Sequence, residues 1–305
     1  MKQPSFGSGH ISIEAVKDKP RSGASQTSAS TDDDVFLTAE VVSLSHTYPF
    51  RFMIPENCTN SPCRWIYPVA FGGGLVGGDS IEASVIVGER CACIVTSQES
   101  TKVYHCHHSG ATSQRLQYTI GDQALLCILS DPVVCFKGAN FQQTQIIEMN
   151  SKSNLVFLDW MLSGRTALQE SWSFQRYLNQ VEVKFLGEVV LRELTDLEDL
   201  PYKSVANGMM NFQVCGVCIV LGEKVQFLSE SLHSKYSRKK DIGEKSNQDV
   251  VVSVSEVSYS IKGQTISGCY LRFLGSTTVQ VSHVIRDITA PLIPLLGADP
   301  FENKL

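Results

Sequence analysis

The sequence predicts a mainly β fold with few helices, and three observations lead to this prediction. Apolar and polar residues alternate with a period of two along several segments, for example along 81–87. Strand-length apolar runs recur along the chain and are separated by turn residues such as Gly88, Gly121 and Gly138. Helical periodicity, by contrast, is convincing only toward the C-terminal end.

The strands are expected in order along the chain. Ile81, Val85 and Val87 share one face of a strand whose other face is polar. The same alternation runs over 115–120, and a hairpin or strand pair spans 181–191 around Gly187. Further strand-length apolar runs lie at 91–96, 124–129, 154–160, 212–221, 250–261 and 269–274.

Two α-helices are expected in the C-terminal part. The first spans Val225 to Tyr236, where apolar residues recur at i, i+3, i+7 and i+11, and basic residues follow it, as the negative end of the helix dipole favours. The second spans 276–288. The polar stretch 237–249 is expected to be an exposed loop, and no repeat of fixed period is evident.

The chain of 305 residues is long enough for one large domain or two modest ones. Residues 17–34 are poor in apolar side chains and rich in Ser, Thr and Asp, as in linkers. We therefore predict a flexible N-terminal segment over 1–34 and a single β-rich domain over 35–305.

The composition excludes several classes of protein. A hydrophobic share of 43% excludes a disordered chain, and 26 basic against 31 acidic residues give no basic surplus for binding nucleic acid. The start of the sequence has no apolar run of the length that a signal sequence needs, and no stretch approaches the about 18 apolar residues of a membrane span. We expect a cytoplasmic protein without a membrane partner, whose ten cysteines are mostly reduced and buried in strands.

A glycine-rich segment, Gly72, Gly73, Gly74, Gly77 and Gly78, ends in Asp79. A phosphate-binding P-loop needs Lys followed by Ser or Thr after its last glycine, but here Asp79-Ser80 follows. The dinucleotide fingerprint needs a helix there, whereas a strand pattern follows. We therefore favour a tight turn or a close backbone approach between two strands over a nucleotide site.

Two groups of residues, one of cysteine and histidine and one of cysteine alone, are candidate metal ligands. His105, Cys106, His107 and His108 follow Cys91 and Cys93, and imidazole and thiolate ligands suit Zn, Ni or Cu. Two interpretations stay open for this cluster: transient metal binding, and a surface turn whose ligands are incidental. The Cys215-Gly216-Val217-Cys218 segment lies in an apolar strand, which favours a buried core over a redox or zinc site.

A fourth segment runs from Asp159-Trp160 through Gly164-Arg165 to Glu170. Arg165 is expected to pair with Asp159 or Glu170, either to shape a turn or to line a channel. No combination of nucleophile and base of a known catalytic type is present in the sequence.

Taken in order, these segments resemble the UreD family of urease accessory proteins, also called UreH. The matching segments are Tyr67-Pro68 with the glycine-rich segment to Asp79, Ser100-Thr101-Lys102-Val103-Tyr104, Asp131-Pro132-Val133, Asp159-Trp160 with Ser163-Gly164-Arg165 and Glu170, and Pro294-Leu295-Leu296-Gly297. The resemblance covers residues 35–300 and is greatest to the eukaryotic branch. Members commonly have glycine before this glutamate, where this chain has Gln169.

The resemblance implies layered or helicoidal stacked β-sheets with a pair of helices. It also implies a non-enzymatic scaffold or chaperone that docks apo-urease with the accessory proteins F and G, the latter a GTPase. Such proteins are thought to pass Ni²⁺ transiently through an internal route, with no tightly bound cofactor. The cysteine and histidine cluster is not part of this resemblance.

A route for Ni²⁺ needs weak oxygen or imidazole sites, because tight binding would trap the ion. The candidates for this passage are Asp79, Glu170 and Asp159, and the alternative role for each is turn capping or pairing with Arg165. Two other functions compete: an enzyme with a Cys/His metal centre, and a β-rich interaction protein without a metal role.

Overall fold

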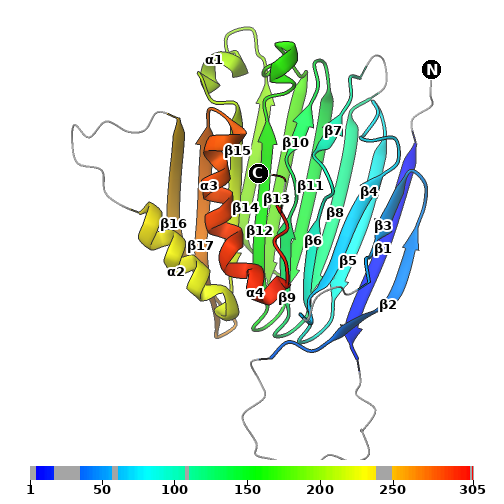
Figure 1. Ribbon diagram of the computed structural model, residues 1–305, viewed down its shortest axis with the longest axis vertical. Coiled ribbons are helices and arrows are strands. Elements are labelled where there is room, and N and C mark those ends of the chain that lie inside the picture. The colour runs from blue at the N-terminus through cyan, green and yellow to red at the C-terminus, as the bar shows by residue number, and fades with distance from the viewer. Residues whose placement is uncertain are drawn as a thin grey trace, which may run out of the picture.

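Two β-sheets lie face to face, and helices cover the outer face of one of them (Figure 1). The computed structural model describes residues 5–16, 35–56, 61–106, 110–237, 249–302 and 304. The described part of the chain is mainly β, as the sequence predicts. None of the helices in these ranges has the length and apolar character that a membrane crossing requires.

The first sheet has seven strands. In spatial order they are β14 (Glu188–Glu198), β13 (Arg176–Phe185), β11 (Asn140–Met149), β8 (Thr112–Ile120), β5 (Ser80–Val87), β1 (Phe6–Ala15) and β2 (Ala39–His46). The four central pairings, from β13 to β1, are parallel, and the two outer pairings are antiparallel.

The second sheet has ten strands. Its main path is β16 (Val250–Ile261), β17 (Gln264–Gly275), β15 (Val214–Leu221), β12 (Asn154–Leu162), β9 (Leu125–Leu129), β6 (Ala92–Thr96), β4 (Arg64–Ala70) and β3 (Phe50–Met53). Two short strands, β7 (Thr101–Val103) and β10 (Val133–Cys135), pair beside this path.

The chain winds between the two sheets as a helicoid. It passes from β5 to β6, β8, β9, β11, β12 and β13, so that successive coils stack as parallel strands in each sheet. Val85, Tyr118 and Ile147 are register partners in one sheet, and Ile94, Cys127 and Val156 are partners in the other. The layered, helicoidal arrangement implied by the resemblance is confirmed.

The corners of the coils stack closely on one another, and Gly88 and Gly121 have no room for a side chain there. A Cβ atom on Gly121 would lie 2.8 Å from the carbonyl carbon of Gly88 and 2.8 Å from the amide nitrogen of Glu89. Arg90, Gln123 and Lys152 occupy equivalent places in three successive corners, each with φ between 51° and 56°. These corner residues are unequally spaced in the sequence, which explains why no repeat of fixed period is visible.

Two apolar cores result from this layering. One lies between the sheets, and the other lies between the ten-stranded sheet and the helices. The covering helices are α2 (Gln226–Tyr236), α3 (Thr278–Thr289) and the short α4 (Ile293–Leu296), while α1 (Val205–Met209) lies at one end. The predictions of helices at Val225–Tyr236 and 276–288 are thus confirmed, and Thr277 caps α3 through Gln280.

The N-terminal region differs from the sequence prediction. The flexible segment expected over 1–34 is wrong for residues 6–15, which form β1 between β5 and β2. Ile11 and Ile13 are fully buried, and Gly9 lies against the ring of Phe50, so close that a Cβ atom would meet Cε1 at 2.4 Å. Residues 17–34 and most of the loop predicted at 237–249 lie outside the described residues.

The corner packing makes a prediction about stability. Gly121→Ala should lower the free energy of unfolding by roughly 1–3 kcal/mol, because the added methyl group meets backbone that cannot move aside cheaply. Gly110→Ala is the matched control, since a Cβ atom there has no neighbour within 4 Å in the described part of the chain. Urea denaturation of both variants measures the difference, and equal stabilities would contradict the stacked-corner explanation.

Candidate functional site

Polar side chains occupy inward-facing positions between the two sheets. In β11, Phe141, Ile147 and Met149 face the core, and Gln143 and Gln145 lie on the same buried face. The neighbouring strands contribute further buried polar residues, Asn179 from β13 and Glu193 from β14. Buried polar groups need partners, so this interior is not a plain apolar core.

These polar residues are in register across the seven-stranded sheet. Gln114, Gln143, Asn179 and Thr195 are successive register partners on β8, β11, β13 and β14. The row spans the four strands from β8 to the edge strand β14, and on β5 the next register partner is the apolar Ile81. A continuous polar row of this kind provides a hydrophilic track through an otherwise apolar layer.

Asp159 faces this row from β12 in the opposite sheet. Its Oδ2 accepts hydrogen bonds from Gln145 Nε2 at 2.8 Å and from Asn179 Nδ2 at 2.7 Å. Burial raises the pKa of Asp159 to about 6, with a further contribution from the negative charge of Glu193, while the two amide donors act in the opposite direction. The carboxylate is therefore costly to bury, yet it is ionised at neutral pH.

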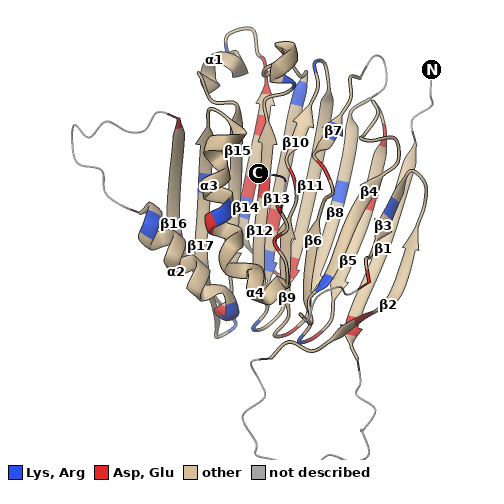
Figure 2. Cartoon of the chain, viewed as in Figure 1, with Lys and Arg blue, Asp and Glu red and all other residues tan. Residues whose placement is uncertain are grey.

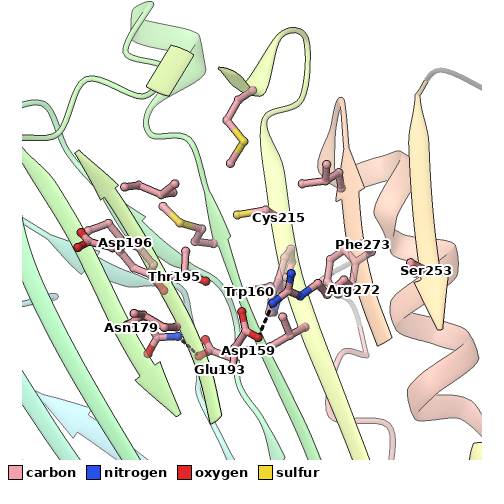
Figure 3. Close-up of a pocket in the computed structure, with 18 of the residues that line it drawn as sticks. Asp159, Trp160, Asn179, Glu193, Thr195, Asp196, Cys215, Ser253, Arg272 and Phe273 are labelled. Carbon is pink, nitrogen blue, oxygen red and sulfur yellow. Dashed lines mark hydrogen bonds and ion pairs between the residues drawn. The ribbon is translucent and has the colours of Figure 1, made fainter. Parts of the chain in front are cut away.

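Asp159 lines two cavities. The larger, about 470 Å³, lies at the open end of the sandwich between β14 and the strands β15, β16 and β17 (Figure 3). The smaller, about 100 Å³, lies between the sheets and is lined by Gln114, Gln143 and Gln145. Asp159 and Trp160 line both cavities. Together the two cavities form the candidate passage.

Toward each end of this passage lies a buried carboxylate, and each of the two is paired with a basic side chain. At the wide end, Glu193 accepts a hydrogen bond from Arg272 Nη2 at 2.6 Å. At the narrow end, Asp131 accepts from Ser97 Oγ at 2.9 Å and from Lys304 Nζ at 2.8 Å. Figure 2 shows acidic and basic residues interspersed over the strands.

Asp79, the first of the predicted passage residues, has a structural role at the end of the glycine-rich segment. Its Oδ1 accepts from Ser5 Oγ at 2.6 Å and from the Ser5 amide at 3.1 Å, and its Oδ2 accepts from the Val76 amide at 3.0 Å. The carboxylate thus joins the start of β1 to the turn, and it lines neither cavity of the passage.

The glycine-rich segment itself forms a tight turn. Gly72, Gly73, Gly74 and Gly78 all have positive φ angles, a region in which glycine is favoured. A Cβ atom on Gly74 would lie 2.4 Å from the carbonyl oxygen of Lys102. The predicted close backbone approach between strands is therefore found here.

Glu170 lies in a second turn, away from Asp159. Arg165 binds its carboxylate with both Nε at 2.8 Å and Nη2 at 2.6 Å, and these hydrogen bonds lower the pKa of Glu170. Of the two partners expected for Arg165, the structure selects Glu170. Gln169 has a φ of 59°, in the left-handed region, which explains why glycine suits this position in the family it resembles. Gly164 is also required, since a Cβ atom would meet Glu170 O at 2.7 Å.

The cysteine and histidine cluster is not a strand and has no metal-binding geometry in its described part. β7 ends at Val103, and His105 Nδ1 lies 2.9 Å from the carbonyl oxygen of Lys137. His107 and His108 lie outside the described residues. Among the residues that the structure describes, no group of three or more His, Cys, Asp or Glu side chains is arranged to hold a metal ion.

The cysteines in the described ranges are free thiols, and most are buried. Cys218 belongs to the core under the helices, while Cys215 is partly buried beside the larger cavity. Burial raises the pKa of the Cys215 thiol to about 12, so that the thiolate required for metal binding or redox chemistry is disfavoured. The buried-core interpretation of this Cys-x-x-Cys segment agrees with these positions.

Sequence reasoning found Asp159 and Trp160 but missed most of the passage. Gln143, Gln145, Asn179, Glu193 and Arg272 were not singled out. One signal was present, because the period-two pattern from Phe141 to Met149 places both glutamines on the apolar face of a strand. Oxygen atoms of carboxylates and amides, arranged along two cavities, can bind a divalent cation weakly and release it.

Comparisons with known proteins agree on one family. Residues 33–304 match the UreD urease accessory protein family. The chain is 33% identical to urease accessory protein D of Arabidopsis thaliana over 276 residues, which cover 83% of this chain and 92% of the relative. It is 28% identical over 306 residues to urease accessory protein D of Oryza sativa subsp. japonica, with 95% and 99% of the two chains covered. A bacterial relative, urease accessory protein UreD of Sorangium cellulosum, is 31% identical over 256 residues, covering 84% and 77%.

The raised pKa of Asp159 makes stability depend on pH. Between about pH 4 and pH 6 the folded carboxyl group holds its proton more tightly than the unfolded one, so the free energy of unfolding falls as the pH rises through this window. Asp159→Asn removes this cost. We expect the variant to be more stable than the parent by up to about 3 kcal/mol at pH 7.5 and nearly equal to it at pH 4.

Urea denaturation of the Asp159→Asn variant and the parent chain at both pH values measures this difference. A variant that is less stable than the parent by the same amount at both pH values would show that Asp159 carries no desolvation cost.

Proposed function

Since the chain belongs to the UreD family of urease accessory proteins, which work in urease maturation, we propose that it helps to deliver nickel to the urease active site through the passage at Asp159. The family is non-catalytic, so the competing interpretation as a metal-centre enzyme is set aside. One observation carries the proposal: the carboxylate of Asp159 lines two cavities.

The chemistry of Asp159 suits a transient ligand for Ni²⁺ as cargo. A carboxylate with a pKa of about 6 is ionised at neutral pH and can attract a divalent cation. Its two hydrogen-bond donors, Gln145 and Asn179, also carry amide oxygens that can contribute weak ligands. Oxygen ligands without thiolates bind nickel weakly enough for the ion to move on, which is what a route requires.

Asp79 and Glu170 stay predictions as passage residues. Each carboxylate already accepts three hydrogen bonds, and these contacts favour the alternative of turn capping or pairing with Arg165. Neither of these two residues lines the larger or the smaller cavity. The proposal therefore rests on Asp159.

We also propose that the chain acts as a cytoplasmic scaffold that docks apo-urease with the accessory proteins F and G. Large apolar side chains support a protein-binding role, because several are exposed near α1: Leu200 at 41%, Tyr202 at 85% and Met210 at 71%. Leu168 is exposed at 61% on the 166–168 turn, which lies at the same end of the molecule (Figure 1). Exposed apolar side chains gathered at one end are typical of interaction sites.

The passage is tested by Asp159→Asn in cells that co-express apo-urease and the F and G proteins. We expect urease activity and the nickel content of purified urease to fall severalfold, because the neutral amide attracts a cation less than a carboxylate does. Co-purification of the variant with the F protein should be unchanged, since the substitution is internal.

Asp287→Asn is the matched control, because Asp287 lies on α3, outside the passage, and pairs with Lys235 at 2.6 Å. It should support activation as the parent chain does. Full activation by a well-folded Asp159→Asn variant would remove the nickel passage and leave an interaction protein without a metal role.

A further inference from the structure

An ion pair that joins the two sheets lines the wide end of the passage. Glu193 comes from β14 of the seven-stranded sheet and is only 5% exposed. Arg272 comes from β17 of the opposite sheet and donates from Nη2 to Glu193 Oε2 at 2.6 Å. The hydroxyl group of Tyr270 donates to the same oxygen and accepts from Arg272 Nε at 2.6 Å.

The two partners of this ion pair differ in burial. The side chain of Glu193 is 6% exposed, whereas that of Arg272 is 60% exposed. Arg272 can therefore swing into solvent without breaking the core, while Glu193 cannot. If Arg272 left alone, a buried carboxylate would remain without a counter-ion, at a large cost in free energy. The guanidinium group of Arg272 is thus expected to separate from Glu193 only when another cation binds to Glu193 instead.

Glu193 and Asp159 line the same cavity, and Asn179 lies beside them (Figure 3). After burial, the negative charge of Glu193 is a further factor that raises the pKa of Asp159. Asn179 is 4% exposed, and its Oδ1 is a buried atom without a hydrogen-bond partner among the residues that the structure describes. Nδ2 of Asn179 donates to Asp159. If the side-chain amide rotated by half a turn, the unpaired Oδ1 would take the place of Nδ2 beside Asp159.

We propose that Arg272 is a gate at the wide end of the passage, a tethered cation that holds Glu193 until an entering divalent cation displaces it. Glu193, Asp159 and the amide oxygen of Asn179 then form an oxygen site for that cation. The exchange replaces one positive group by another, so the buried carboxylates stay compensated throughout. This inference rests on the proposed nickel passage for its cargo, but the site is testable on the isolated chain.

The gate predicts that removing Arg272 strengthens metal binding. The purified chain is titrated with NiCl₂ in a calorimeter at pH 7.5. Arg272→Gln should bind Ni²⁺ about tenfold more tightly than the parent, because the metal no longer competes with a partly exposed ion pair. Adding Glu193→Gln to this variant should return the affinity to the parent value or below it.

Arg192→Gln is the matched control. Arg192 is the neighbour of Glu193 on β14, but it points to the outer face and pairs with Glu182 at 2.8 Å. The Arg192→Gln substitution removes one positive charge, as Arg272→Gln does, but leaves the passage unchanged. The nickel affinity of the Arg192→Gln variant should therefore equal that of the parent chain. Equal affinities of Arg272→Gln and Arg192→Gln would overturn the proposal and leave Arg272 as a structural partner of Glu193.

Arg272→Lys covers the case in which Arg272→Gln does not fold. Lysine keeps the charge but loses the fork that contacts Glu193 and Tyr270 together, so nickel affinity should rise less than with glutamine, yet measurably. An unchanged affinity in a folded Arg272→Lys variant would count against the gate. Tighter binding supports the gate whatever the urease activation assay shows, whereas full activation by Asp159→Asn removes only the proposed function.

Discussion

Asp159 places an ionisable group on the face of β12 whose other residues, Leu155, Phe157 and Met161, belong to the core between the sheets. A carboxylate in this position loses its hydration, and the interior has to compensate for that loss. Gln145 and Asn179 do so from the opposite sheet, and two cavities keep space beside the group. Asn179, a member of the polar row, and Gln145 on the neighbouring strand thus provide the polar contacts that this carboxylate needs.

The helicoidal frame makes that arrangement possible. Because successive coils stack in register, residues from β8, β11, β13 and β14 line up as one polar row, although they are far apart in the sequence. The same frame brings Glu193 and Arg272 together from different sheets at the open end. At the other end, Asp131 is paired with Lys304. The passage thus has a buried carboxylate at its centre and a neutralised carboxylate toward each end.

Strands such as 81–87 and the helices α2 and α3 could be predicted because each has one apolar face of regular period. β11 was missed because Gln143 and Gln145 interrupt its apolar face, and β1 because glycine and serine dilute its two buried isoleucines. Asp159 was found through a local motif. Glu193 and Arg272 were not, since their pairing joins strands of different sheets and leaves no local pattern. Asp79 and Glu170 were chosen for their turns, and they cap those turns.

The most direct test of the nickel passage is to locate the ion. Crystals of the chain soaked in Ni²⁺ at pH 7.5 can be examined by anomalous scattering at the nickel absorption edge. The passage predicts a peak of partial occupancy between the sheets, beside Asp159 and within reach of Asn179 or Gln145. Nickel found only at exposed side chains such as His46, with none beside Asp159, would contradict it.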